Sequence, residues 1–244
     1  MPTASHANRQ HIVAAYDREL TQLRAQVIEM GEAVVEQTRM ALCSLLDGDG
    51  AAAGTVLDRE PQIDRLSQLA DEEVFAVIAR RQPTAADLRL VLAIAKVVGE
   101  LERGGDKAER IARNVLRMLD AGPATVPDSV ATGLKDLDAV ACCMLERAVD
   151  GLTVPDLAKA TGVFQDESRL RAAASSLNRT LVEAHGSLHG QQLAGLLTIA
   201  HALERIGNHA ANIAEQVVYV ITGEDVRYRN RELLLDALRH GELG

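Results

Sequence analysis

The chain has 244 residues, of which 47% are hydrophobic but only 2% aromatic, and it carries a formal net charge of −9. The acidic balance argues against binding along a nucleic-acid phosphate backbone. The sequence contains no run of about 18 uncharged apolar residues, so no membrane-spanning helix is expected. The first residues lack the apolar stretch of a secretory signal, so we expect a cytoplasmic protein.

Helix is favoured over sheet throughout the chain. Aromatic residues and β-branched runs are scarce, and there are only six prolines. The core must therefore consist mainly of Leu, Val, Ile and Ala, a composition typical of packed helices.

Three long helices are predicted in the first half. The first runs from Arg9 to about Asp47, where apolar residues recur at helical spacing, and it ends in Asp-Gly-Asp-Gly. The second runs from about Ala51 to Arg80, because the residue before a proline disfavours helical geometry. The third begins at Thr84 with a capping-box-like start and continues to Ala121, where Gly-Pro closes it.

The second half repeats this plan. A fourth helix is expected from Thr125-Val-Pro-Asp128 to Asp150-Gly151, and a fifth from Thr153-Val-Pro-Asp156 to about His185-Gly186. A sixth runs from about Gln191 to Thr222, with Gly223 as its stop. A short tail follows, in which residues 229–239 have a pattern compatible with helix.

An internal repeat connects the two halves. The block Leu101-Glu-Arg-Gly-Gly-Asp-Lys-Ala-Glu-Arg-Ile-Ala112 aligns without gaps on Leu203-Glu-Arg-Ile-Gly-Asn-His-Ala-Ala-Asn-Ile-Ala214. Such a repeat indicates one structural unit used twice. We therefore predict an all-α fold of two tandem antiparallel three-helix bundles, residues 9–122 and 125–222, with a tail at 223–244.

A long coiled coil is the alternative to this fold. The regular short loops count against it, as do four glycines inside the expected helices, where each costs about 1 kcal/mol relative to alanine. We expect these glycines to allow close approach of neighbouring backbones. They are Gly99, Gly104, Gly105 and Gly207.

Paired carboxylates are the candidate metal ligands. Glu102 and Asp106 lie one turn apart on one face of the third helix, and Glu60 and Asp64 have the same spacing on the second. If adjacent helices bring both pairs together, their oxygens suit Mg, Mn, Fe or Zn. The alternative is an exposed face of ion pairs, since arginines follow several of these acids by three or four positions.

The second repeat is the weaker metal candidate. Its matching positions are Glu204 and Asn208, so one acid is replaced by an amide. On the fifth helix Glu167 and Arg171 align with Glu60 and Asp64, and an arginine there would oppose a bound cation. The sequence contains no Ser-His-Asp or Cys-His grouping, Gly-rich phosphate loop or zinc signature, so no catalytic residues are predicted and the protein is not expected to be an enzyme.

Several motifs together resemble the PhoU family of phosphate-signalling proteins. In chain order they are Glu19-Leu-x-x-Leu-Arg24 with Met30-Gly31, Arg81-Gln-Pro-Thr-Ala-Ala-Asp-Leu-Arg89, Glu100-Leu-Glu-Arg-x-Gly-Asp106, Leu203-Glu-Arg-Ile-Gly-x-His-Ala-x-Asn-Ile-Ala-Glu215 and Thr222-Gly-Glu-Asp-Val-Arg227. The resemblance covers nearly the whole chain. The fold it implies, two tandem three-helix bundles, agrees with the one read from the helix pattern.

The resemblance also implies a function. Family members are cytoplasmic negative regulators of the phosphate regulon that relay the state of the high-affinity phosphate ABC transporter to a sensor histidine kinase and restrain uptake. Expected partners are that kinase, the transporter's ATPase subunit and a second copy of this chain in a homodimer. Nucleic acid is not an expected partner, and any membrane association is indirect.

Some family members bind metal clusters through the Glu-x-x-x-Asp motifs. Carried over, the ligands are Glu102 and Asp106, with Glu204 and Asn208 in the second half. Gly104 and Asn208 depart from the family pattern at this motif. Three other interpretations remain. A metalloenzyme would require an open coordination site and a general base, and the sequence identifies neither. A metal-binding bundle would hold a cluster that is structural or stores metal, and a plain helical scaffold would leave the repeated Glu-Arg-x-Gly block unexplained.

Overall fold

The structure is a computed structural model that describes residues 4–122, 125–186, 188–227, 229 and 231–240. These residues form seven α-helices and one short 3₁₀ turn and contain no strand, which confirms the predicted all-α class. The elements are α1 (Ala4–Asp47), α2 (Gly50–Arg81), α3 (Ala85–Asp120), α4 (Asp128–Thr153), α5 (Leu157–Glu183), η1 (Ala184–Gly186), α6 (Gly190–Thr222) and α7 (Arg231–His240).

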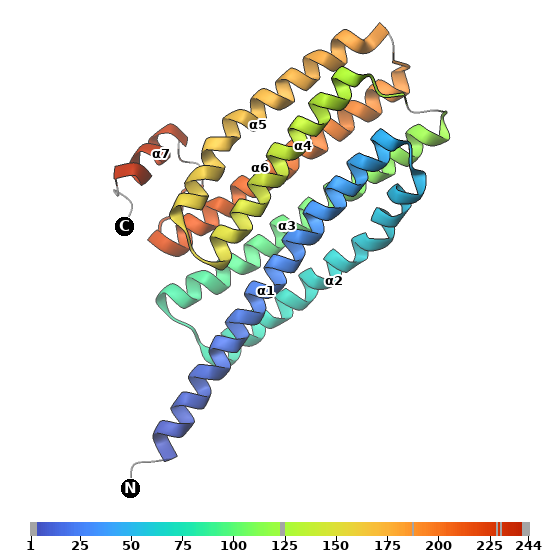
Figure 1. The fold of residues 1–244 in the computed structure, drawn as a ribbon. Coiled ribbons are helices and arrows are strands. Elements are labelled where there is room, and N and C mark those ends of the chain that lie inside the picture. Colours follow the sequence, from blue (N-terminus) through green and yellow to red (C-terminus); the bar gives the residue numbers. More distant parts are fainter. Residues whose placement is uncertain (1–3, 123–124, 187, 228, 230, 241–244) are drawn as a thin grey trace.

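The helices form two three-helix groups that lie side by side (Figure 1). Helices α1, α2 and α3 pack on one another, as do α4, α5 and α6, and we call these groups the first and second bundle. The bundles meet where α3 packs on α6 and α1 packs on α4. The helices fold back on short connections, so the coiled-coil alternative is wrong.

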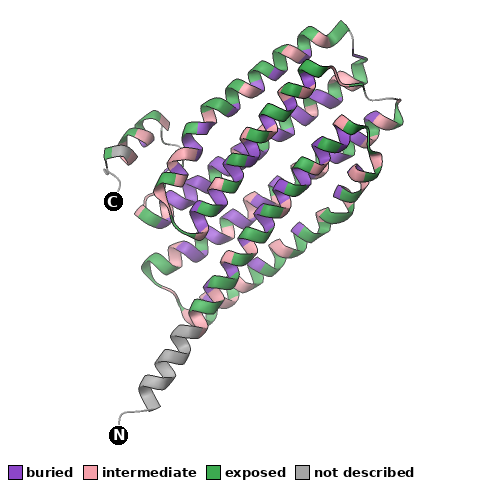
Figure 2. Cartoon of the chain, in the orientation of Figure 1, coloured by how far each residue is buried: buried purple, intermediate pink, exposed green. Residues whose placement is uncertain are grey.

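Packing between the helices is almost entirely aliphatic. Buried residues recur along each of the six long helices (Figure 2). Leu23 and Met30 of α1, Leu101 of α3 and Leu134 of α4 are fully buried. Fully burying one such side chain contributes about 1.5–3 kcal/mol, so apolar burial is the dominant stabilising term.

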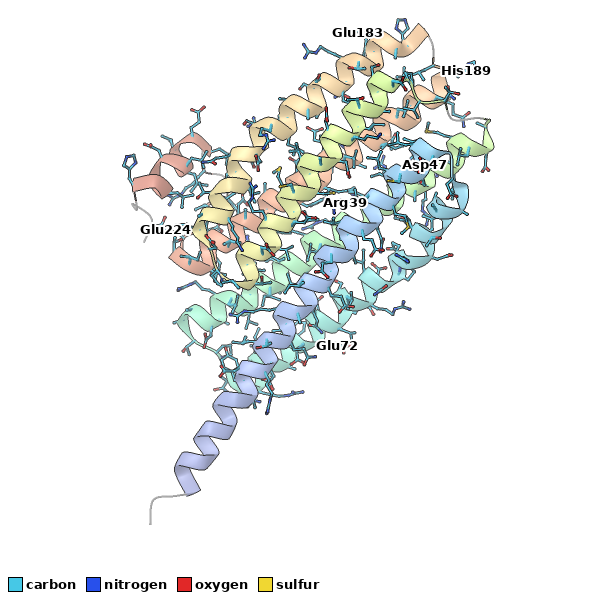
Figure 3. The ribbon with its side chains drawn as sticks, viewed as in Figure 1. Arg39, Asp47, Glu72, Glu183, His189 and Glu224 are labelled. Atoms are coloured by element: carbon cyan, nitrogen blue, oxygen red, sulfur yellow. The ribbon has the colours of Figure 1, made fainter. Side chains whose placement is uncertain are left out.

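Ion pairs at the surface add little to this packing. Arg39 of α1, labelled in Figure 3, lies 2.9 Å from Glu146 of α4, and both side chains are about half exposed. Exposed pairs of this kind contribute about 0–1 kcal/mol. The α1–α4 contact therefore depends mainly on its apolar residues.

Helix starts follow local capping chemistry where a suitable side chain is present. Asp49 caps α2 by accepting from the amides of Ala51 and Ala52, at 2.9 and 3.1 Å. Asp156 caps α5 in the same way. Thr84 occupies the N-cap position of α3 but makes no side-chain capping hydrogen bond, so the expected capping box is not formed.

One expected helix end was wrong. We predicted that α4 stops at Asp150-Gly151, but the helix continues to Thr153. Gly151 is buried inside the helix, and a Cβ at that position would lie 3.2 Å from Cβ of Lys159 on α5. The glycine therefore serves close packing of α5 on α4, and α5 starts only after Pro155.

The mid-helix glycines accommodate side chains and not backbones, which corrects our expectation. A Cβ at Gly105 would lie 2.9 Å from Ile63 Cδ1, and one at Gly207 would lie 2.5 Å from Leu170 Cδ2. Gly104 similarly leaves room for Val34. Gly99 is different, because a Cβ there would meet no atom within 4 Å.

Among the helices that the structure describes, none combines the length and the apolar character that a bilayer span requires.

Candidate functional site

The seam between α3 and α6 brings together residues from two of the sequence motifs. The helices run antiparallel, so the first half of α3 faces the last turns of α6. Arg103 comes from the first repeat block, Glu100 directly precedes that block, and His209 and Asn212 come from the second. His209 and Asn212 are three positions apart on α6, which places both on one face of that helix.

Glu100 is the centre of this cluster. Its Oε2 lies 2.8 Å from Nδ1 of His209 and 3.0 Å from Nδ2 of Asn212, both on the opposite bundle. Arg103 forms an ion pair with the other carboxylate oxygen. Because an ionised carboxylate can only accept, Nδ1 of the histidine is the donor in this pair.

The cluster is largely shielded from solvent. The side chain of His209 is 3% exposed and that of Glu100 is 14% exposed. Within the described part of the chain, Nε2 of His209 has no hydrogen-bond partner. Buried polar groups of this kind cost free energy unless they are paired, so the Glu100–His209 contact is a strong constraint on how the bundles meet.

The surroundings of Glu100 keep it ionised. Burial alone would raise the pKa of this carboxyl. The hydrogen bonds from His209 and Asn212, together with the Arg103 charge, lower the pKa by more than burial raises it, so the net pKa shift is downward. A carboxylate with three fixed partners and a low pKa is a poor proton donor at neutral pH. The arrangement therefore suits a polar joint between the bundles.

A polar cavity of about 600 Å³ opens beside this joint. It is bordered by side chains of both signs and by the open face of Gly99. Nζ of Lys96 lies 5.3 Å from the ring centroid of Tyr219, one turn before the end of α6. The lining residues are Ala95, Lys96, Gly99, Glu100, Arg103, Asn212, Glu215, Gln216 and Arg227.

Other motif residues hold helix ends in place. Arg81, at the end of α2, makes two 2.8 Å hydrogen bonds to the carboxylate of Glu19 on α1. Arg89 lies against Gly223, the left-handed residue that ends α6, where a Cβ would come within 3.5 Å of the guanidinium. The first and last motifs are thus structural contacts at helix ends.

Of the predicted metal ligands of the first bundle, Asp64 and Asp106 lie close enough to Glu60 for their charges to act on it. Burial raises the pKa of Glu60 on α2, and the charges of Asp64, Glu109 and Asp106 raise it further. Glu60 and Glu102 are half-buried, and Asp64 and Asp106 are exposed. Among the residues that the structure describes, no three His, Cys, Asp or Glu side chains are arranged to hold a metal ion.

In the second bundle the corresponding residues have other partners. Glu204 and Asn208 are half-buried on α6, and Nδ1 of the exposed His201 lies 4.0 Å from Glu204. Arg171 donates to the backbone carbonyl of Glu167. Glu167 itself is bound by Arg231 of α7, a contact that we did not predict.

Sequence reasoning missed the Glu100 cluster as a unit. Its members belong to the quoted motifs, but neither Glu100 nor His209 was predicted to be a site residue. The available signal was the shared face of His209 and Asn212. Spacing along one helix could not identify an acceptor on another helix more than 100 residues away.

Comparison with known proteins links this chain to one family. A family model for the PhoU domain matches the chain twice, over residues 27–115 and 134–217. A Burkholderia sp. protein named "Phosphate-specific transport system accessory protein PhoU homolog" is 37% identical over 92% of this chain and 96% of its own length. The Escherichia coli K12 accessory protein PhoU is 29% identical over 89% of this chain and 90% of its own.

Solved structures agree with the sequence comparison. The crystal structure of PhoU from Pseudomonas aeruginosa superposes with a TM-score of 0.79 and 30% sequence identity. The superposition covers 86% of this chain and all of that one. The similarity therefore extends over both bundles.

Proposed function

This chain belongs to the PhoU family, and we propose that it is a cytoplasmic accessory protein of a phosphate-specific transport system that acts as a negative regulator of phosphate-starvation genes. In this proposal it relays the state of the high-affinity phosphate transporter to a sensor histidine kinase and restrains uptake. The observation that supports the proposal is the match of the PhoU family model in both bundles. A relative named as a phosphate-specific transport system accessory protein also aligns over 96% of its own length.

The geometry of the α3–α6 seam favours binding over catalysis. Glu100 is fixed by His209, Asn212 and Arg103, and its lowered pKa keeps it charged. A joint of this kind sets how the two bundles are oriented relative to each other. A regulator that contacts two partners needs such a defined orientation, because each partner binds a surface of fixed shape.

The proposed partners are the ATPase subunit of the transporter and the kinase, with a second copy of this chain forming a homodimer. Contact with the membrane is then indirect, through these partners. The curated relatives are named as accessory proteins of a transport system, which supports a transporter subunit as one partner.

A deletion strain tests the regulatory role. Loss of this gene should switch on a phosphate-starvation reporter in phosphate-rich medium, and the wild-type gene supplied in trans should silence it again. Complementation with His209→Ala should silence the reporter poorly, whereas Arg103→Ala, which changes an exposed residue at the same carboxylate, should complement well. A deletion strain whose reporter stays silent in rich phosphate would refute the proposal.

We also propose a cation-binding role for the first bundle, as a secondary function of structural or storage type. Its support is the half-buried Glu60, whose pKa is raised by burial and then by the charges of neighbouring acids, an unfavourable arrangement that a divalent or trivalent ion would relieve. The described arrangement does not fit a preformed metal site. No part of the regulatory proposal therefore depends on a metal.

A further inference from the structure

Helix α7 lies against the second bundle at the end where α6 stops (Figure 1). The chain leaves α6 at Gly223, passes Glu224, which is labelled in Figure 3, and enters α7 at Arg231. Helix α7 packs on the beginning of α5. Its first residue, Arg231, makes hydrogen bonds to the second bundle.

Arg231 bridges two acids from different helices. Its Nε lies 3.2 and 3.0 Å from the two carboxylate oxygens of Glu167 on α5, and its Nη2 lies 2.7 Å from Glu215 on α6. The guanidinium also stacks over the ring of Phe164, 4.3 Å from the ring centroid. A planar guanidinium suits this combination of two carboxylates and an aromatic face, which an ammonium group could not match.

The two acids need a cation between them. Glu215 is buried, and burial raises the pKa of its carboxyl, an effect that Glu167 increases and Arg231 opposes. In the repeat alignment Glu215 corresponds to Arg113 of α3, whose charge acts on Glu60 of the first bundle. The first bundle thus carries a cation on its own third helix, whereas α7 supplies the corresponding charge to the second.

Apolar residues add to the contacts of α7. Leu234 is buried, Leu235 and Leu238 pack against the core, and Leu238 borders a groove of about 410 Å³ at the start of α5. Small residues such as Ala158 and Gly162 line this groove. A ten-residue helix is not stable alone in water, so α7 stays helical only while it is docked.

We propose that this surface, formed by Glu167, Glu215, Phe164 and the groove at the start of α5, is a docking site for an amphipathic partner helix, and that α7 is its tethered occupant. The partner helix carries an arginine, followed by leucines three and seven positions later. That pattern copies Arg231, Leu234 and Leu238 and follows the i, i+3, i+7 spacing of helices that bind grooves. The site is therefore closed until a partner helix displaces α7.

The tether predicts a measurable competition. A segment joined to the rest of the chain by a short linker has an effective concentration in the millimolar range. A free peptide with the α7 sequence should therefore bind the wild-type chain poorly. It should bind at least about tenfold more tightly to Arg231→Met, in which the tethered helix has lost its anchor while both acids remain.

The experiment uses the full-length chain and a capped, fluorescent peptide that copies residues 229–240. Amide hydrogen exchange should show faster exchange across α7 in Arg231→Met than in wild type. The matched control is Arg229→Met, which removes the same charge two residues away. Within the described residues, this arginine pairs with Glu224 of the connecting segment and not with Glu167 or Glu215. This control should leave both the exchange of α7 and the peptide affinity at wild-type values.

Two further variants make the result specific. A peptide in which methionine replaces the arginine, or a Glu167→Gln change added to Arg231→Met, should abolish the gain in affinity. If Arg231→Met does not fold by circular dichroism, Arg231→Lys should show the same effects in weaker form. The proposal is overturned if α7 exchanges at the wild-type rate in the folded Arg231 variant, or if the peptide binds that variant no more tightly than it binds wild type.

Discussion

Replacing His209 with alanine removes the donor that ties α6 to Glu100 of α3, and we expect it to destabilise the joint between the bundles. The two groups are 2.8 Å apart, with side chains only 3% and 14% exposed. A hydrogen bond to a charged group in such surroundings contributes about 1.5–3 kcal/mol. Asn212 and Arg103 remain on Glu100 in the variant, so the chain should still fold.

A double-mutant cycle isolates this contribution. The free energy of unfolding is measured by urea denaturation, followed by circular dichroism, for wild type, Glu100→Ala, His209→Ala and the double variant. We expect a coupling energy of about 1.5–3 kcal/mol between the two positions.

The control for this cycle is Arg103→Ala in place of His209→Ala. The Arg103 side chain is 52% exposed, so its coupling to Glu100 should be at most about 1 kcal/mol. A Glu100–His209 coupling below about 0.5 kcal/mol would lie within the usual scatter of additivity. It would show that the seam does not depend on this contact.

Three other outcomes follow from the same contacts. Because the pKa of Glu100 is lowered on folding, its ionised form stabilises the fold above the ordinary pKa of 4.5, and this stabilisation is lost as the pH falls below that value. When the free energy of unfolding is measured during acid titration, Glu100→Gln should therefore lose less stability than wild type. Gly99→Ala should raise the free energy of unfolding by up to about 1 kcal/mol, because the new methyl group meets open space and alanine favours the helix. Gly207→Ala should lower the free energy of unfolding by about 1 kcal/mol, because the clash with a buried leucine outweighs the gain in helix propensity. Urea denaturation measures both changes. Elemental analysis should find any bound metal in the first bundle, lost in Asp106→Asn, with a second site gained in Asn208→Asp; metal retained undiminished in Asp106→Asn would contradict this.

Helix boundaries were predictable where local chemistry decides them. Gly223 adopts the left-handed conformation that ends α6, and Pro83 follows directly after the last turn of α2. These effects act over a few residues, so they are visible in the sequence alone. Where a glycine served packing the same reasoning failed, because Gly151 looks like a helix stop until α5 is placed beside it.

The sequence by itself determined the helical class, the approximate extent of the six long helices and the family. These depend on apolar periodicity, on proline and glycine positions and on the order of the motifs, all of which are local or additive properties.

Only the tertiary structure decided which charged groups meet. The charge of Asp106 acts on Glu60, Glu100 contacts His209, and Arg231 bridges two acids on different helices. Each of these contacts joins helices that are distant in sequence. Their geometry follows from how the aliphatic faces pack, and a spacing rule along one helix carries no information about the rotation and position of the next.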